Sequence, residues 1–347
     1  MRYAKWLDYM EVADPKIEMI TRNAAEILTA QELEELVSKK SAPSVYLGRA
    51  ITGPLHVGHL VSISKLLDLQ KAGFNAIVLL ADIHAALDDL KSKWEELEIR
   101  REYTRKAIEL AVEWKEKPKF VVGSDYQLGE DYQMDIFKMS TLASVKVALH
   151  AASEVTRMKN PKVSELIYPI MQALDEKYLG VDMQLGGLDQ RHIMAFAREY
   201  MPKLGYEKRI ELMMPLVPSL KGPGVKMSSS VQGTNIKVNA SEEEIKKTIA
   251  GAYCPIGDLK DNPITAIVTL LMLPEKGKFT IARESKFGGD LEITSKRQFE
   301  ELYTSKAIHP SDLKAAVSEY LINKLARARD YFESNRDLLR SLGPNFE

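Results

Sequence analysis

The sequence of 347 residues contains a single cysteine, Cys254. One thiol cannot build a disulfide framework or a zinc site made of cysteines, which fits the reducing interior of a cell. Residues 1–8 lack the apolar run of a signal peptide. The longest apolar stretches, around 76–81 and 270–274, are far too short to span a bilayer. We therefore expect a soluble, cytoplasmic protein without a membrane segment.

Net charge is also low, at −1, so the chain offers no overall positive field for a nucleic acid. A local basic patch lies within 138–165. Its cations are Lys138, Lys146, Arg157, Lys159 and Lys162, with His150 among them, and its acidic residues are Glu154 and Glu165. Such a run fits a solvated helix face or a nucleic-acid contact. Hydrophobic residues at 45% and charged residues at 28% exclude disordered, collagen-like and coiled-coil classes.

Apolar periodicity predicts alternating strands and helices up to about residue 217. Strands are expected at 45–47, 76–80 and 120–122, with helices at 57–71 and 94–114 between them. This alternation is typical of a parallel sheet with helices on its faces. Further helices are expected at 132–163 (broken near 160), 166–178 and 190–200, and further strands at 183–185 and 213–217. Before the first strand, helical spacing is present at Ile17, Ile20, Ala24, Ile27 and Leu28.

A loop rich in glycine, proline and serine, at 221–230, is followed by sequence of a different character. The pairs Ser241 with Glu244 and Ser295 with Gln298 have the spacing of capping boxes. Helices are expected at 241–253, 263–273, 295–305 and 310–340. The length suits about two domains. We therefore predict an α/β domain at 1–230 and a mostly helical domain at 231–347.

Two histidines follow the strand expected at 45–47, at the start of the helix expected at 57–71. His56 and His59 are three residues apart, so they share one helical face. A helix N-terminus attracts anions, and both imidazoles can donate to a phosphate. Gly58 between them leaves room for a planar base or a ribose. The alternative is a zinc site, which needs a third and usually a fourth ligand that no cysteine or nearby histidine supplies.

The glycine-rich loop carries Lys226 followed, after Met227, by three serines at 228–230. A lysine and small hydroxyls on a mobile loop can close over a pyrophosphate as charge leaves the α-phosphate of a nucleotide. The alternative is a polar surface linker. Because the loop follows the last predicted strand of the α/β region and the histidines follow the 45–47 strand, their co-occurrence favours a nucleotide site.

Both elements resemble the signature motifs of class I aminoacyl-tRNA synthetases. The segment from His56 to His59 is similar to the family's HIGH motif, and 226–230 is similar to its KMSKS motif. Four further segments resemble tyrosyl-tRNA synthetases of the archaeal and eukaryotic type: 81–85, 168–175, 186–191 and 286–290. The resemblance extends over about 17–340, nearly the whole chain.

The resemblance implies that L-tyrosine is activated by ATP, used as its Mg²⁺ complex, and transferred as tyrosyl-adenylate to the 3′ end of tRNA(Tyr). It implies a Rossmann-type catalytic domain with a helical connective insertion at about 125–165, an anticodon-binding C-terminal domain, a homodimer and no tightly bound protein metal. The residues it assigns are His56, His59 and Lys226 for catalysis; Gly48, Gly58, Asp189, Met227, Ser228, Ser229 and Ser230 for ATP; Tyr46, Tyr168, Gln172, Asp175 and Gln190 for tyrosine; and Phe287, His309 and Asp312 for the anticodon.

More specifically, the resemblance assigns the tyrosine phenol to Tyr46 and Asp175, and the ATP ribose to Asp189. It assigns the ammonium group of tyrosine to Tyr168, Gln172 and Gln190. In the C-terminal domain, it implies that Phe287 and His309 stack on an anticodon base and that Asp312 contacts the edge of that base. Splayed bases stacked on aromatic side chains are typical of single-stranded RNA recognition.

The residues themselves support part of this assignment. Tyr168, Gln172 and Asp175 lie at i, i+4 and i+7, so they share one face of a helix that is otherwise apolar. Buried polar groups need partners, and a ligand is one candidate; a network satisfied within the protein is the other. For Phe287, His309 and Asp312, the sequence alone indicates only a loop and a helix start at Pro310.

Two positions depart from the family's usual pattern. Many tyrosyl enzymes have an acidic residue soon after the first strand of the sheet, where this chain has Arg49 and Ala50; Arg49 faces either ATP or solvent. The second lysine of KMSKS is Ser229 here, so pyrophosphate contacts depend more on Lys226. Three other functions remain as alternatives: a tryptophanyl enzyme, a small-molecule nucleotidyltransferase and a non-catalytic RNA-binding relative.

Overall fold

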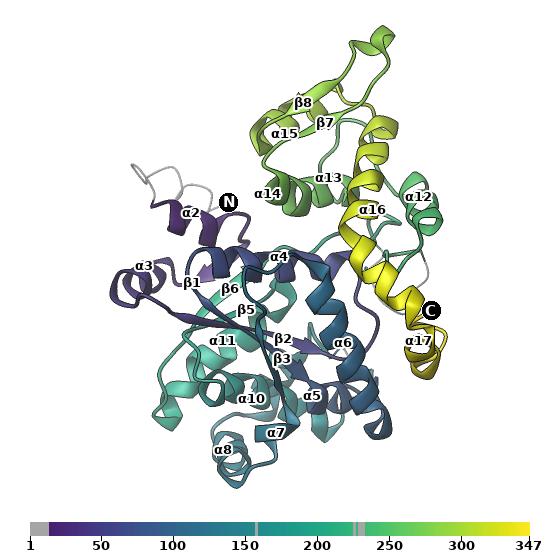
Figure 1. Ribbon diagram of the computed structural model, residues 1–347. Coiled ribbons are helices and arrows are strands. Elements are labelled where there is room, and N and C mark those ends of the chain that lie inside the picture. Colours follow the sequence, from purple (N-terminus) through teal and green to yellow (C-terminus); the bar gives the residue numbers. More distant parts are fainter. Residues whose placement is uncertain (1–13, 157–158, 225–226, 228–232) are drawn as a thin grey trace. The chain divides into compact units, whose positions relative to one another are not determined.

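The computed structural model describes residues 14–156, 159–224, 227 and 233–347 (Figure 1). Four of the expected site residues, Lys226, Ser228, Ser229 and Ser230, lie outside these ranges. The chain divides into two compact units. The first unit comprises Met1–Thr52, Ser62–Arg105 and Trp114–Leu216, and the second comprises Gly53–Val61, Lys106–Glu113 and Val217–Glu347.

A six-stranded sheet forms the centre of the first unit (Figure 1). Its strands are β1 (Glu26–Leu28), β2 (Ser44–Ala50), β3 (Asn75–Ala81), β4 (Lys119–Val122), β5 (Met183–Gly187) and β6 (Ile210–Met214). They lie side by side in the order β1-β6-β5-β2-β3-β4. Every neighbouring pair is parallel except β1 with β6. The predicted α/β fold with a parallel sheet is therefore confirmed.

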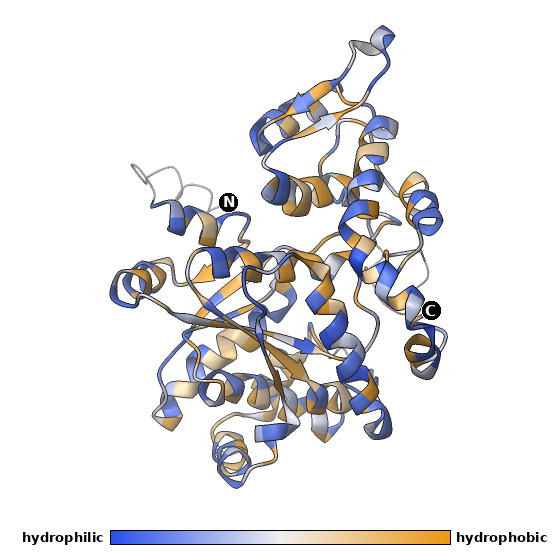
Figure 2. Cartoon of the chain, viewed as in Figure 1, coloured by the Kyte–Doolittle hydropathy of each residue, from blue (hydrophilic) through white to orange (hydrophobic). Residues whose placement is uncertain are grey.

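Strands β3, β5 and β6 are mostly buried, whereas β2 is buried only at residues 45–47. All five residues of β6 are buried, as are four of the five in β5, and Ala76, Val78 and residues 79–81 are buried in β3. Figure 2 shows these strands as mostly hydrophobic. Since helices cover both faces of a parallel sheet, its strands have continuous apolar runs instead of alternating ones. These continuous apolar runs are the pattern from which the strands were predicted.

The helices at 57–71, 97–111, 163–178 and 191–200 lie close to their predicted positions, whereas those at 82–87 and 124–127 were not predicted. The helices of residues 14–216 are α2 (Pro15–Thr21), α3 (Ala30–Lys39), α4 (Val57–Lys71), α5 (Asp82–Leu87), η1 (Trp94–Glu96), α6 (Leu97–Ala111), α7 (Ser124–Gln127), α8 (Glu130–Ser140), α9 (Val145–Ala152), α10 (Val163–Tyr178), η2 (Leu188–Gln190), α11 (Arg191–Tyr200) and η3 (Met201–Leu204). Helix α10 packs against α8, α9 and α11. Their shared core contains Tyr132, Met171, Leu174, Ile193 and Phe196.

Three details of the first unit differ from the sequence predictions. Ile27 and Leu28 lie in β1 instead of a helix, because two adjacent apolar residues fit either period and Ile27 pairs with Leu212 of β6. Strand β6 ends at Met214, since Pro215 has no N–H to donate to a ladder. The helical stretch predicted at 132–163 is interrupted within its first turns: α8 ends at 140, and Ser144 caps α9.

The second unit is mostly helical from residue 233 onward. Its elements there are α12 (Glu242–Ala250), α13 (Pro263–Ile267), the π-helical η4 (Val268–Met272), α14 (Leu273–Lys276), β7 (Phe279–Ile281), η5 (Ser285–Phe287), β8 (Leu291–Ile293), α15 (Lys296–Thr304), α16 (Pro310–Ser334) and α17 (Arg336–Leu342). Helix α16 packs against α12, α13 and β7. The antiparallel pair β7–β8 was not predicted, because three-residue strands are too short to show a period.

The two predicted caps lie where the sequence placed them. Ser241 and Ser295 accept hydrogen bonds from the backbone N–H of Glu244 and Gln298. The Gln298 side chain accepts from the N–H of Thr294, so the pairing differs from a regular capping box. Among the helices in the described ranges, none has the length and hydropathy needed to cross a membrane.

Candidate active site

The first unit has a point where the connections of its sheet diverge. Strand β2 lies between β3 and β5, and the chain runs first to β3 on one side and later to β5 on the other. In open parallel sheets, ligands bind at the carboxyl ends of the strands at such a point. Because β2 ends at Ala50 and β5 ends at Gly187, the residues at these two ends are the first candidates.

Two glycines at the end of β5 allow the next turn to fold back closely. A Cβ atom at Gly187 would lie 2.6 Å from Oδ1 of Asp189, and one at Gly186 would lie 3.1 Å from Cγ of Gln190 and 2.7 Å from Cε of Met194. Carbon atoms do not approach so closely without displacement. Glycine at both positions therefore lets η2 hold Asp189 and Gln190 against the end of the strand.

The residues expected to bind tyrosine gather within the first unit. Tyr46 lies on β2, Gln190 on η2, and the other three on α10. The Tyr46 hydroxyl donates to the backbone oxygen of Gln172 at 3.4 Å, and Nε2 of Gln172 donates to Oε1 of Gln190 at 3.2 Å. Tyr168 and Asp175 are buried on the same face of α10 as Gln172. The structure thus brings Gln172 into direct contact with both Tyr46 and Gln190.

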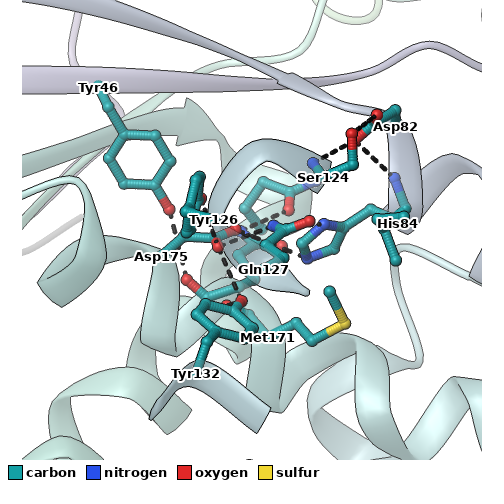
Figure 3. Close-up of polar contacts among 12 residues, drawn as sticks. Tyr46, Asp82, His84, Ser124, Tyr126, Gln127, Tyr132, Met171 and Asp175 are labelled. Atoms are coloured by element: carbon teal, nitrogen blue, oxygen red, sulfur yellow. Dashed lines mark hydrogen bonds and ion pairs between the residues drawn. The ribbon is translucent and has the colours of Figure 1, made fainter. Parts of the chain in front are cut away.

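Asp175 is the centre of a buried polar network (Figure 3). Its Oδ1 accepts hydrogen bonds from the Tyr126 hydroxyl at 2.7 Å, the Tyr132 hydroxyl at 2.8 Å and Nε2 of Gln127 at 2.9 Å. Its Oδ2 accepts none from the described residues, and Asp175 as a whole is 1% exposed. Burial raises the pKa of Asp175 to about 7, although hydrogen bonds from Gln127, Tyr126 and Tyr132 lower it.

A buried histidine completes this network. Nε2 of His84 lies 3.7 Å from Oδ2 of Asp175, and its ring meets the ring of Tyr168 edge-on at 4.8 Å. Burial lowers the pKa of His84 to about 4, so the imidazole is neutral at pH 7. The sequence analysis named His84 only within the segment 81–85 and predicted no role for it.

The three donors to Asp175 were also missed. Tyr126, Gln127 and Tyr132 lie 43 to 49 residues before Asp175, at the start of the expected insertion. No period or motif connects residues at such a separation. Only tertiary packing, of α8 against α10 and of α7 against α8, brings them to the carboxylate.

A second buried acidic pair lies beside this site. Glu176, next to Asp175 on α10, and Glu211 of β6 are both fully buried, and their carboxyl oxygens have no hydrogen-bond partner among the described residues. Burial raises the pKa of both carboxyls, that of Glu176 to about 8. Because the pKa of Glu176 lies above 7, the pair retains at least one proton at pH 7.

His56 and His59 belong to the second unit and contact each other. Their rings stack with centroids 3.6 Å apart. Nδ1 of His59 accepts from the N–H of His56 at 3.1 Å, and Nδ1 of His56 accepts from the N–H of Gly58 at 3.2 Å. Since both Nδ1 atoms are acceptors, each neutral ring carries its proton on Nε2, which is a hydrogen-bond donor.

Gly58 is required by close packing at the start of α4. A Cβ atom there would lie 2.7 Å from Sδ of Met227 and 3.1 Å from the His56 ring. Met227 is the described residue of the 226–230 segment, and it is buried. Within the second unit, therefore, Gly58 and His56 adjoin the residue that follows Lys226.

The residues expected to bind the anticodon also lie in the second unit. Phe287 ends η5, and His309 is the N-cap of α16, where its Nδ1 accepts from the N–H of Ser311 at 3.2 Å. The Ser311 hydroxyl donates to Oδ1 of Asp312 at 3.3 Å. His309 and Asp312 thus form one cluster through Ser311.

Arg283 holds the loop after β7 in place. Its Nε donates to the backbone oxygen of Gly289 at 2.8 Å, and its Nη1 donates to that of Ala307 at 3.0 Å. Ala307 lies two residues before His309. Arg283 therefore ties the loop that contains η5 to the start of α16.

Within the described ranges, no group of three or more histidine, cysteine, aspartate or glutamate side chains is arranged to hold a metal ion. The side chains that are brought together instead suit organic ligands. Buried hydroxyl, amide and carboxyl groups surround Asp175, and imidazole donors sit at the start of α4.

Comparisons with known proteins agree on the class. Residues 38–326 match the family model described as tRNA synthetases class I (W and Y). The chain is 44% identical to the tyrosine--tRNA ligase of Archaeoglobus fulgidus over 90% of this chain and 96% of that protein. It is 40% identical to the cytoplasmic tyrosine--tRNA ligase of Danio rerio over 92% of this chain but 61% of that protein.

A solved structure gives the same result. The fold matches that of the Archaeoglobus fulgidus tyrosyl-tRNA synthetase complexed with L-tyrosine, with a TM-score of 0.87 and 43% sequence identity, over 91% of this chain and 98% of that one. The match places the chain among class I aminoacyl-tRNA synthetases. Within that class, the chain belongs to the tyrosine--tRNA ligase family.

Proposed function

We propose that this enzyme activates L-tyrosine with the Mg²⁺ complex of ATP and transfers the tyrosyl group to the 3′ end of tRNA(Tyr). The observation that carries the proposal is that Tyr46 and Asp175 are both buried in the first unit, each 1% exposed. A tyrosine phenol both donates and accepts a hydrogen bond. Asp175 has an oxygen, Oδ2, that can accept from it, and the Tyr46 hydroxyl can donate to it. Tryptophan has no hydroxyl to use this pair.

In the first step, an oxygen of the tyrosine carboxylate attacks the α-phosphorus of ATP, and the bond to the departing pyrophosphate breaks. In the second step, a hydroxyl of the terminal tRNA ribose attacks the carbonyl carbon of tyrosyl-adenylate, and AMP departs. Neither step needs a covalent enzyme intermediate. The protein therefore acts by holding the reactants in line and by stabilising charge.

The ammonium group of tyrosine is assigned to Tyr168, Gln172 and Gln190. The contact between the Gln172 and Gln190 side chains supports this, since the two amides can turn their oxygens to one cation. Asp189, held at the end of β5 by the glycines before it, is assigned to the ATP ribose, whose hydroxyls a carboxylate can accept.

The phosphates of ATP are assigned to the residues around the start of α4 and the loop that follows β6. His56 and His59 donate through Nε2, and Lys226 neutralises the departing pyrophosphate. The remaining ATP-binding residues of this assignment are Gly48, Gly58, Met227, Ser228, Ser229 and Ser230.

Residues 1–230 are assigned to catalysis, with a connective insertion at about 125–165, and residues 231–347 to anticodon binding. Phe287 and His309 stack on an anticodon base, and Asp312 accepts a hydrogen bond from its edge. The cluster of His309, Ser311 and Asp312 supports this, because it fixes the imidazole and the carboxylate next to each other.

The active form is assigned as a homodimer in the cytoplasm. Five large apolar side chains between residues 128 and 145 are exposed, and a soluble monomer rarely exposes so many together. They are Leu128, Met134, Phe137, Leu142 and Val145, with Leu128 and Phe137 each more than 60% exposed. These residues belong to the expected insertion, so the insertion is the proposed dimer surface.

The direct test is charging of RNA. Purified enzyme should attach labelled tyrosine to a tRNA(Tyr) transcript and leave a tRNA(Trp) transcript uncharged. Charging of tRNA(Trp) with tryptophan would replace the proposal with the tryptophanyl alternative. Adenylate formation without charging of any tRNA would favour the small-molecule nucleotidyltransferase instead.

A further inference from the structure

Arg49 occupies an unusual place for a cation. It is the penultimate residue of β2, opposite Leu80 of β3, at the carboxyl end of the strand that borders the switch point of the sheet. Its side chain is half-buried. Ligands of open parallel sheets bind at this end of the strands.

The guanidinium of Arg49 has no hydrogen bond or ion pair with the described residues. Its electrostatic neighbours are Tyr103, Tyr168 and Asp189. Burial lowers its pKa to about 10, so the group is still charged at pH 7. A cation that is partly removed from water and has no anionic partner in contact is costly to the fold, and a bound anion would compensate that cost.

Tyrosine and ATP each bring an anion to this end of the sheet. Tyr168, one neighbour of Arg49, is assigned to the tyrosine ammonium, and in an amino acid the ammonium and carboxylate are attached to one carbon atom. Arginine matches a carboxylate with two parallel N–H···O bonds, which few other side chains can form. Asp189, the other neighbour with an assigned ligand, is assigned to the ATP ribose, which carries no charge, so Tyr168 is the neighbour whose ligand brings an anion, the tyrosine carboxylate.

We propose that Arg49 binds the α-carboxylate of the amino-acid substrate and orients it for attack on the α-phosphorus. This inference rests on the proposed tyrosine site and adds a residue to it. When the carboxylate oxygen bonds to phosphorus, the group loses its negative charge. Arg49 therefore holds the substrate more strongly than the adenylate, and its loss affects KM for tyrosine more than kcat.

The test compares two ligands that differ only at the carboxylate. Tyrosinol has a hydroxymethyl group in its place, so Arg49 can contribute little to its binding. Binding of tyrosine and of tyrosinol is measured by calorimetry for the wild type, Arg49→Met and Arg49→Lys. Arg49→Met should weaken tyrosine binding about 10- to 100-fold, as for loss of a hydrogen bond to a charged group, and tyrosinol binding less than about 3-fold.

Arg49→Lys should recover part of the tyrosine affinity, because it restores the charge without the two-pronged geometry. Lys119→Met is the matched control, since Lys119 is exposed at the amino end of β4, away from the carboxyl ends of the strands. It should leave both affinities unchanged.

Three results would overturn the assignment: equal weakening of both ligands, unchanged tyrosine binding in Arg49→Met, or an effect confined to the KM for ATP, which would assign Arg49 to a phosphate. Failure of the proposed function looks different, because the wild type itself would then bind neither tyrosine nor tyrosinol.

Discussion

Replacing Asp175 with asparagine should narrow the preference for tyrosine over phenylalanine while preserving the fold. Asparagine keeps an oxygen for the three donors Tyr126, Gln127 and Tyr132. Alanine would leave all three donors buried and unpaired, at about 1–3 kcal/mol each, and would confuse a loss of recognition with a loss of stability. Asparagine is therefore the more informative change.

The size of the effect follows from the change in the acceptor. A hydrogen bond from the tyrosine hydroxyl to the charged carboxylate contributes about 1.5–3 kcal/mol, and the amide nitrogen that replaces Oδ2 in asparagine cannot accept it. Phenylalanine makes no such bond in either protein. The ratio of kcat/KM for tyrosine to that for phenylalanine should therefore fall by about 1.5–3 kcal/mol, or roughly 12- to 160-fold.

The same carboxyl predicts a pH dependence. Burial raises the pKa of Asp175 to about 7, so its charged form increases between pH 6 and pH 8. The wild-type ratio of tyrosine to phenylalanine should rise over this range, because the carboxylate is the stronger acceptor. In Asp175→Asn the ratio should not change with pH.

Both quantities can be measured by ATP–pyrophosphate exchange with each amino acid from pH 6 to pH 8. Tyr126→Phe is the control: it removes one donor to Oδ1 and leaves Oδ2 in place, so the ratio should change less than about 3-fold. If Asp175→Asn retains both the wild-type ratio and its pH dependence, Asp175 does not recognise the hydroxyl.

Three further predictions concern other parts of the molecule. His59→Ala should slow adenylate formation about 10²–10³-fold in single-turnover experiments without changing the Kd for tyrosine, because the imidazole stabilises charge that develops in the transition state; an unchanged rate would remove His59 from catalysis. Asp312→Ala should lower aminoacylation of tRNA(Tyr) about 10-fold and leave pyrophosphate exchange intact, whereas equal damage to both reactions would indicate a folding defect. Glu211→Gln should raise Tm by a few degrees at pH 8 and by less at pH 5. Burial raises the pKa of Glu176 and Glu211 in the folded state, so the stability that this pair contributes is lost as pH rises towards those values. An equal shift in Tm at both pH values would contradict this.

Much of the sheet was predictable because its strands are buried on both faces. A continuous apolar run such as 76–80 has no other common explanation when glycine and a charged helix flank it. Strand β1 was missed because Ile27 and Leu28 fit a helical period equally well, and their pairing with β6 spans more than 180 residues.

The site was predictable where its residues are neighbours on one element. The spacing of Tyr168, Gln172 and Asp175 placed three polar side chains on one face of α10. The donors to Asp175 were not predictable, because tertiary packing alone brings α7 and α8 to that face. The roles expected for Phe287, His309 and Asp312 came from family resemblance, since their own sequence indicates only a loop and a helix cap.

The central claim is that this chain activates tyrosine, and ATP–pyrophosphate exchange with each of the twenty amino acids tests it most directly. The wild-type enzyme with Mg²⁺ and ATP should exchange label rapidly with tyrosine and far more slowly with phenylalanine, because phenylalanine leaves Oδ2 of the buried Asp175 without a donor. Exchange that depends on tryptophan, or no exchange with any amino acid, would contradict the account.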